Sequence, residues 1–263
     1  MHRILMRLRQ IWGIYSDCVN KFISSPKPSS KASGLWSNLN DTMPRRTPTK
    51  GICELCGHTF AKAAMAKHIS TCSNQSSPKK AGPVFHIVAQ DPHDHRYWLH
   101  CEAVQDAKLR DLDDFLRDIW LECCGHMSAF RIDNQEYTAP QAVTETGARN
   151  MNVRIADVLS PGQQFHYEYD FGSTTELALS VIDAGPSKKG DKWVSLLARN
   201  EPPSFSCMEC KGKATELCVD ECFESGPDGA ALCEKCSQKH DCDEDMRLPI
   251  VNSPRMGVCG YEG

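Results

Sequence analysis

The chain has 263 residues, of which 40% are hydrophobic and 24% are charged, and its formal net charge is −4. This length is enough for one or two packed domains, and aliphatic and aromatic residues recur throughout, which excludes a disordered polymer. The mean hydropathy of −0.45 and the lack of an apolar run near the ~20 residues of a spanning helix exclude an integral membrane protein.

The cysteines are abundant and unevenly placed. Of the 15 cysteines, four are isolated or adjacent (Cys18, Cys101, Cys123 and Cys124), and the other eleven lie in two spaced groups near the ends. A secreted disulfide scaffold would spread its cysteines more evenly. The pattern therefore predicts metal binding in a reducing compartment, the cytoplasm.

Charge is also uneven along the chain. Residues 1–80 hold 13 Lys and Arg against 3 Asp and Glu, residues 81–203 hold 11 against 19, and residues 204–263 hold 6 against 12. A basic first third places any contact with a nucleic acid in the N-terminal part. For residues 1–48 alone we favour a disordered leader kept in solution by these charges. The alternatives are that translation starts at Met43, so that most of this leader is not part of the protein, and that the leader is an Arg-rich presequence.

Residues 49–75 predict a zinc finger. Cys53 and Cys56 are two residues apart, and His68 and Cys72 follow at the spacing of two ligands on one helical face. Two thiolates on a tight turn and a His/Cys pair on a helix complete a tetrahedron around one ion. Phe60 and Met65 stand where a ββα finger keeps its small core, so the segment resembles a CCHC zinc finger. Nearby lysines offer contacts to phosphates.

After a polar linker over 76–83, residues 84–203 predict an α+β domain with a mostly antiparallel sheet. Expected strands are 84–89, 97–103, 130–137, 165–171, 176–182 and 193–198, with a short helix over 153–159. Apolar residues recur at three- and four-residue steps from Leu109 to Cys123. This periodicity predicts one long amphipathic helix that ends at Gly125.

Two stretches of this domain resemble a known family. The helix end DFLRDIWLECCGHMSAF (114–130) and the segment YEYDFG (167–172) are similar to plasmid pRiA4b ORF-3-like proteins, which are also grouped with passenger proteins of insertion elements. The resemblance covers about residues 84–200 and implies an α+β fold without an established activity. Much of the family continues after the glycine with an acidic residue, an aromatic residue and a His. This chain instead has Ser173 to Leu177, so no role of that His carries over.

Catalytic interpretations of the middle domain are weaker than structural ones. Cys123 fits a buried face of the helix, and His126 is placed to cap the helix carbonyls, although a nucleophile–base pair is the alternative. Asp170 is more simply a turn residue before Gly172 than a catalytic carboxylate. His93 and His95 stand on an expected turn without a third ligand nearby.

Residues 204–263 predict a cysteine-rich zinc module. Its ligand pairs exceed the needs of one ion, so two interleaved sites are expected. The first takes Cys207, Cys210, Cys233 and Cys236; the second takes Cys218, Cys222, His240 and either Cys242 or Cys259, with Asp220, Glu221 or Asp241 as substitutes. The spacing is similar to B-box-type modules, which imply protein contacts.

The tail from Leu248 to Tyr261 contains apolar residues and glycines, so we expect it to pack back on a domain, where Cys259 is available to a metal. Together these features predict a non-catalytic zinc protein. It would act as an adaptor or nucleic-acid-associated factor, with the basic N-terminal third contacting nucleic acid and the acidic C-terminal module contacting a protein. The alternative is an enzyme that acts on nucleic acid through the middle domain.

Overall fold

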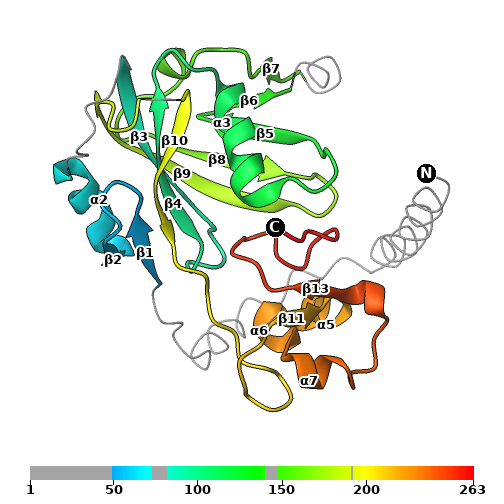
Figure 1. Ribbon diagram of the computed structural model, residues 1–263. Helices are drawn as coiled ribbons and strands as arrows, with labels where there is room; N and C mark the ends of the chain where they lie inside the picture. The colour runs from blue at the N-terminus through cyan, green and yellow to red at the C-terminus, as the bar shows by residue number, and fades with distance from the viewer. Residues whose placement is uncertain (1–48, 73–81, 140–146, 191) are drawn as a thin grey trace, which may run out of the picture. The chain divides into compact units, whose positions relative to one another are not determined.

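The computed structural model of the chain describes residues 49–72, 82–139, 147–190 and 192–263. All described residues belong to one compact unit, Arg46–Gly263. The expected leader and nearly all of the expected linker lie outside the described residues. Figure 1 shows the arrangement of the elements. Within the described ranges, no helix combines the length and apolar character needed to cross a membrane.

A ten-stranded sheet forms the centre of this unit, in the order β2-β1-β10-β4-β3-β9-β8-β5-β6-β7. Neighbouring strands are antiparallel except for β6 and β7, which pair in parallel. The predicted sheet is therefore present, although the predicted strand over 130–137 is a hairpin of two strands. The strands are β1 (Lys50–Cys53), β2 (Thr59–Ala61), β3 (Pro83–Gln90), β4 (Trp98–Val104), β5 (Ser128–Ile132), β6 (Gln135–Thr138), β7 (Arg149–Asn150), β8 (Gln164–Tyr169), β9 (Thr175–Pro186) and β10 (Val194–Asn200).

Side-chain alternation separates the two faces of this sheet. On one face, odd-numbered residues of β4 such as Leu99 and Cys101 join the main core, together with Tyr167 of β8 and Leu112 of helix α3 (Leu109–Leu116). The short helix expected over 153–159 is a 3₁₀ turn, η4 (Ile155–Asp157). The opposite face carries even-numbered residues of β4, including Trp98, which packs against the segment predicted to be a zinc finger.

The prediction of one long amphipathic helix is wrong. Helix α3 has 8 residues, and a π-helical turn, η2 (Arg117–Leu121), follows it directly. The apolar stripe is nevertheless buried along both pieces, with Leu109, Leu116 and Trp120 fully inside. A π turn adds a residue to the hydrogen-bonded ring, so the stripe continues into the core while the regular α-helix ends. Periodicity in the sequence reports burial and does not distinguish these two helical forms.

The finger segment is continuous with the sheet. Strand β1 pairs with β2 on one side and with β10 on the other, and helix α2 (Lys62–Thr71) buries Met65 and Ile69. These side chains share a cluster with Trp98 and Leu197 of the sheet. Gly51 permits this close approach, because a Cβ there would lie 2.4 Å from the Trp98 ring and 2.5 Å from the Arg199 carbonyl oxygen.

The C-terminal module has a sheet of its own, in the order β12-β11-β13. Its own apolar cluster includes Phe205, Leu217 and Leu248. The module's elements are β11 (Glu216–Cys218), α5 (Val219–Ser225), α6 (Pro227–Ala230), β12 (Ala231–Leu232), α7 (Glu234–Ser237), the 3₁₀ turn η5 (Glu244–Met246) and β13 (Arg247–Pro249). Side chains join it to the sheet domain: Arg96, in the β3–β4 turn, forms an ion pair with Asp228 at 2.9 Å and lies over the Phe205 ring at 4.5 Å.

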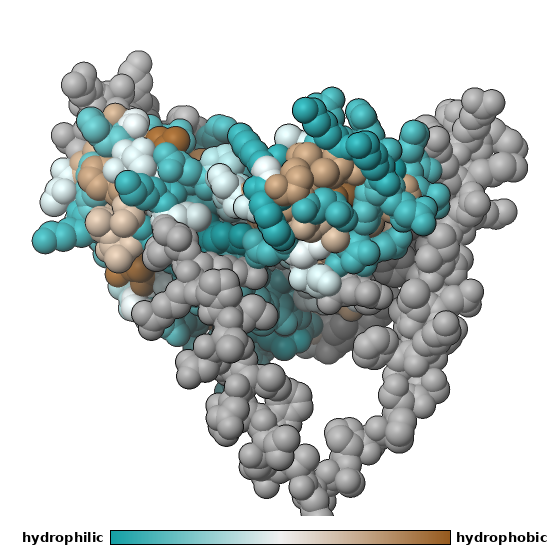
Figure 2. Space-filling view, turned by 90° about the horizontal axis from the view of Figure 1, so that it is seen from below, coloured by the Kyte–Doolittle hydropathy of each residue, from teal (hydrophilic) through white to brown (hydrophobic). Residues whose placement is uncertain are grey.

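The tail after β13 returns to the middle domain, as expected from its composition. The Ser253 hydroxyl donates to the Trp120 carbonyl oxygen at 2.6 Å, and the side-chain amide of Asn200 donates to that of Asn252 at 2.7 Å. Arg255 is fully buried. Figure 2 shows that the visible described surface is mostly hydrophilic, with hydrophobic residues gathered in a few small areas.

Candidate metal centres

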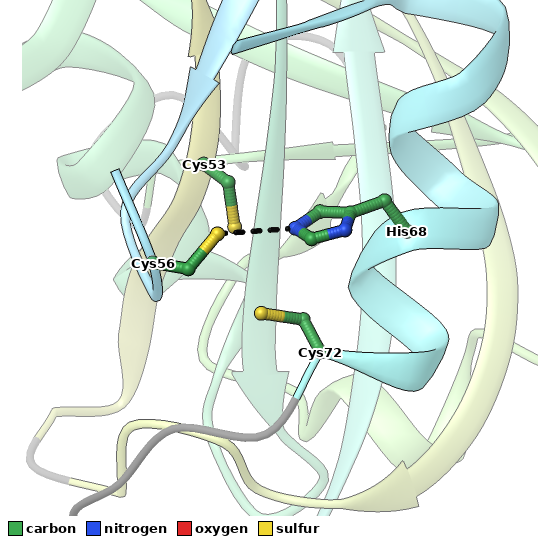
Figure 3. A group of neighbouring side chains, drawn as sticks. All are labelled: Cys53, Cys56, His68 and Cys72. Atoms are coloured by element: carbon green, nitrogen blue, oxygen red, sulfur yellow. Dashed lines mark hydrogen bonds between the residues drawn. The ribbon is translucent and has the colours of Figure 1, made fainter. Parts of the chain in front are cut away.

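The finger segment brings its four predicted ligands together. Cys53, Cys56, His68 and Cys72 place their ligand atoms within 4.8 Å of one another, and Figure 3 shows the three thiols and the imidazole pointing toward a common centre. The Cys56 Sγ and the His68 Nε2 are 3.3 Å apart. Four cysteine and histidine ligands around one point can hold a metal ion.

Local backbone geometry positions these ligands. Cys53 ends β1, and the Gly57 N–H donates to the Cys53 carbonyl oxygen at 2.7 Å, which closes the turn that carries Cys56. Gly57 has a φ of 75°, a conformation that favours glycine. The His68 ring stacks on Phe60 with centroids 3.8 Å apart, so the predicted finger core fixes the orientation of the imidazole.

The pKa values of the finger thiols diverge. The backbone N–H of His58 is the main cause that lowers the pKa of Cys56 to about 6. Burial and the neighbouring thiols instead raise the pKa of Cys72 to about 11. Several thiolates cannot accumulate in one place without a cation, because like charges repel. A bound metal ion would remove this conflict, since its charge favours deprotonation of every coordinating thiol.

A second complete set lies in the C-terminal module. Cys207, Cys210, Cys233 and Cys236 gather within the same limit, in the combination expected for the first interleaved site, and the Sγ atoms of Cys210 and Cys233 are 3.7 Å apart. Burial disfavours the Cys207 thiolate, but backbone N–H groups of Cys210 and Cys233, among others, outweigh it and lower the pKa of Cys207 to about 6.

The other expected site in this module is incomplete. Cys218, His240 and Cys242 lie together, and Cys222 is outside this group. The Cys222 side chain packs in the apolar cluster of the module, and its Sγ would be only 2.8 Å from a Cβ at Gly257. Of the two residues left open for the last ligand, the structure brings Cys242 to this group. Three ligands leave one coordination position of a tetrahedron to another group.

Cys259 lies elsewhere, beside Cys123, Cys124 and His126 of the middle domain. Sequence reasoning treated the first two as core or isolated cysteines and His126 as a helix cap. Cys123 does pack against the core. The His126 imidazole lies against the Cys124 and Cys259 thiols instead of the helix end, with its Nε2 2.9 and 3.3 Å from their Sγ atoms. The sequence signal for this group is the CC-x-H motif, which has no fourth ligand nearby. The fourth ligand, Cys259, follows more than 130 residues later.

The remaining candidate residues have structural partners. Asp170 has a φ of 65°, and its Oδ1 accepts a hydrogen bond from the Gly172 N–H at 3.0 Å, which is the expected turn role. Its Oδ2 pairs with Arg255 at 2.7 Å. His93 lies in an exposed contact with Glu176 at 3.2 Å. His95 is exposed and belongs to none of the metal-ligand groups among the described residues.

Comparison with known proteins finds a family similarity over part of the chain. Residues 88–210 match the plasmid pRiA4b ORF-3-like protein family. The matched segment includes Cys123 to His126 and ends at the first two cysteines of the C-terminal module; it is somewhat less than half of the chain. The finger lies outside it, as does the tail.

No curated protein gave a significant match. Among solved structures, the crystal structure of the protein of unknown function MM3350 from Methanosarcina mazei Go1 is similar, with 15% identity and a TM-score of 0.39, over 43% of this chain and 67% of that chain.

Proposed function

We propose that the protein is a zinc-binding adaptor or nucleic-acid-associated factor without catalytic activity, which acts in the reducing cytoplasm. One observation carries the proposal: two sets of four cysteine and histidine ligands, one in the finger and one around Cys207, are complete in the described fold. Thiolate-rich tetrahedral sets suit zinc, and a set closed by four protein ligands is typical of structural sites, since a catalytic site keeps one position open.

The polar groups of the middle domain support a non-catalytic role. A depression of about 470 Å³ is lined by charged residues that include Asp113 and Arg117. Asp113 already accepts hydrogen bonds from the Tyr167 hydroxyl at 2.7 Å and the Ser128 hydroxyl at 2.6 Å. A general base needs a free lone pair directed at a substrate, whereas this carboxylate is occupied in holding the sheet and helix together.

We assign the partner contacts to opposite ends of the chain. The C-terminal module carries exposed acidic residues such as Asp241, Asp243 and Glu244, which suit a basic surface on a partner protein. Basic residues are concentrated before residue 81, and the exposed Lys67 of α2 is placed to meet a phosphate. The family's link to plasmid and mobile-element proteins agrees with nucleic-acid association.

Native mass spectrometry of the full chain tests zinc binding. We expect Cys53→Ser and Cys207→Ser each to carry one zinc ion fewer than the wild type, because each variant opens a different set of four ligands. Cys101→Ala is the matched control, since Cys101 is a buried cysteine outside all the ligand groups in the described part of the chain. A wild type without zinc, or ligand variants with unchanged zinc, would contradict the proposal.

Salt-dependent binding tests the nucleic-acid contact. Binding of the full chain to a mixed-sequence DNA duplex and to a single-stranded RNA should weaken steeply with salt. Lys67→Gln should reduce the slope of log K against log salt by about 1. Lys235→Gln, at an exposed lysine of the C-terminal module, should leave the slope unchanged. Absence of binding at low salt, or equal slopes in both variants, would show that the finger does not contact nucleic acid.

A further inference from the structure

Four potential ligands meet where the tail reaches the middle domain. The Sγ atoms of Cys123 and Cys124 are 3.7 Å apart, as are those of Cys124 and Cys259. The His126 Nε2 is 2.9 Å from the Cys124 Sγ and 3.3 Å from the Cys259 Sγ. All four ligand atoms lie within 4.8 Å of one another, although Cys259 is far from the other three in the sequence.

The sulfur–sulfur separations are those of a metal tetrahedron, and the imidazole nitrogen lies somewhat closer to the sulfurs. Zinc–sulfur bonds of about 2.3 Å place two sulfur ligands about 3.8 Å apart in a regular tetrahedron. A disulfide requires about 2.05 Å between the sulfurs, so the thiols are too far apart to be bonded to each other. Three thiols and one imidazole are also one of the common ligand sets of structural zinc sites. The distances match those of the finger and of the Cys207 set.

The backbone of the tail presents Cys259 to this point. Cys259 has a φ of 53°, and Gly257 and Gly260 on either side have φ values of 80° and 67°. A non-glycine residue in the left-handed region costs free energy and persists where its surroundings hold it. The tight turns reverse the chain between the buried Met256 and the buried Tyr261 and direct the Cys259 side chain to the middle domain.

Contacts beside the cluster also hold the tail against the middle domain, and these contacts do not involve a metal. The Arg255 guanidinium donates to Asp170 at 2.7 Å and to the Thr175 hydroxyl at 3.1 Å, and it lies 4.8 Å from the centroid of the Tyr169 ring. The Tyr169 ring in turn meets the His126 ring edge to face, with centroids 5.7 Å apart. The cluster is therefore bordered by buried contacts that fix the tail and the imidazole independently.

We propose that Cys123, Cys124, His126 and Cys259 form a further zinc centre that fastens the C-terminal tail to the middle domain. The proposal goes beyond the proposed function, because none of these ligands belongs to the finger or to the groups around Cys207 and Cys218. Its role is to join two parts of one chain: the ion would cross-link the segment after η2 to the tail that follows β13. Such a cross-link lowers the conformational entropy of the tail in its detached state, much as a disulfide does.

The test uses the full chain and two readouts. In native mass spectrometry, Cys259→Ser and His126→Gln should each carry one zinc ion fewer than the wild type, and Cys101→Ala should carry the full number. In hydrogen exchange, the amides of residues 251–261 should exchange at least tenfold faster in Cys259→Ser than in the wild type, while those of β11 and β12 keep their protection.

The outcomes separate this proposal from the proposed function. Unchanged zinc in both Cys259→Ser and His126→Gln overturns the new centre, even if Cys53→Ser and Cys207→Ser each lose an ion. A wild-type intact mass lower by two hydrogens, abolished in Cys259→Ser, shows a disulfide and also overturns it. Loss of zinc without faster exchange in the tail overturns the fastening role. Loss of zinc only in the finger and Cys207 variants supports the proposed function alone.

Discussion

The finger and the C-terminal module bury their apolar side chains in different ways. Both are short segments with few large apolar residues, so neither can bury a sizeable core alone. The finger adds its strand β1 to the edge of β10 and shares Trp98 and Leu197 with the sheet. The C-terminal module instead builds a separate three-stranded sheet and its own apolar cluster. The finger thus shares a hydrophobic core with the sheet, whereas the module relies on its own apolar cluster and its candidate metal ligands.

This difference predicts unequal dependence on metal. Strand pairing and a shared aromatic residue hold the finger hairpin even without an ion, because backbone hydrogen bonds to β10 remain. The module has short strands of 2 or 3 residues each, and such small sheets are marginal in water. On the proposed function, metal coordination would then supply much of its folding free energy.

Metal removal should have the largest effect. A strong chelator, or the variant Cys207→Ser, should abolish hydrogen-exchange protection over residues 207–242, because a structural zinc ion contributes on the order of 10 kcal/mol to such modules. Cys53→Ser should expose the amides of α2 while those of β10, β4 and β3 stay protected. Equal loss of protection in the finger strand β1 and in β11 would contradict the comparison.

Trp98→Ala should have the next largest effect and act on the finger alone. Trp98 is fully buried between the sheet and the finger, and its indole N–H donates to the Thr49 hydroxyl at 2.9 Å. Removing a buried tryptophan costs about 3–5 kcal/mol, measurable by urea unfolding. Trp193→Ala is the matched control, since 56% of Trp193 is exposed, and should change stability by less than about 0.5 kcal/mol. Equal effects would refute the shared core.

The smallest predicted effect concerns pH at the junction between the finger and the sheet. Burial, the neighbouring His86 and Lys62 of the finger helix lower the pKa of His100 to about 3. The unfolded chain binds a proton at this residue below its ordinary pKa of about 6.5, so stability is present above that pH and falls as the pH decreases toward the folded value. The loss by pH 5 should be about 2 kcal/mol.

Urea unfolding at pH 7 and pH 5 measures this effect. In His100→Gln the difference between the two pH values should shrink, because glutamine does not titrate. His95→Gln, at an exposed histidine of the β3–β4 turn, should lose as much stability as the wild type does. Any release of metal by acid is common to both variants, so it cancels in the comparison. An undiminished pH effect in His100→Gln would show that another group is responsible.

Local spacing in the sequence anticipated much of the finger and of the sheet. Cys53 and Cys56 stand on one turn, and His68 and Cys72 lie one helical turn apart, so short-range geometry brings each pair together. Short stretches rich in aliphatic and aromatic residues, separated by turn residues, similarly indicated β3, β4 and β8. The single long helix was not found, because the same stripe of buried residues fits an α-helix and a π turn equally well.

The amino-acid sequence by itself indicated the closely spaced ligand pairs of the finger and of the Cys207 set, and most strands of the middle domain, since both depend on neighbours within a few residues. Only the tertiary structure decided three further matters: the pairing of β1 with β10, the exclusion of Cys222 from the Cys218 group, and the meeting of Cys259 with Cys123, Cys124 and His126. Each depends on contacts between residues far apart along the chain. Such contacts depend on how the surfaces of the whole fold pack together, and short-range sequence patterns do not predict that packing.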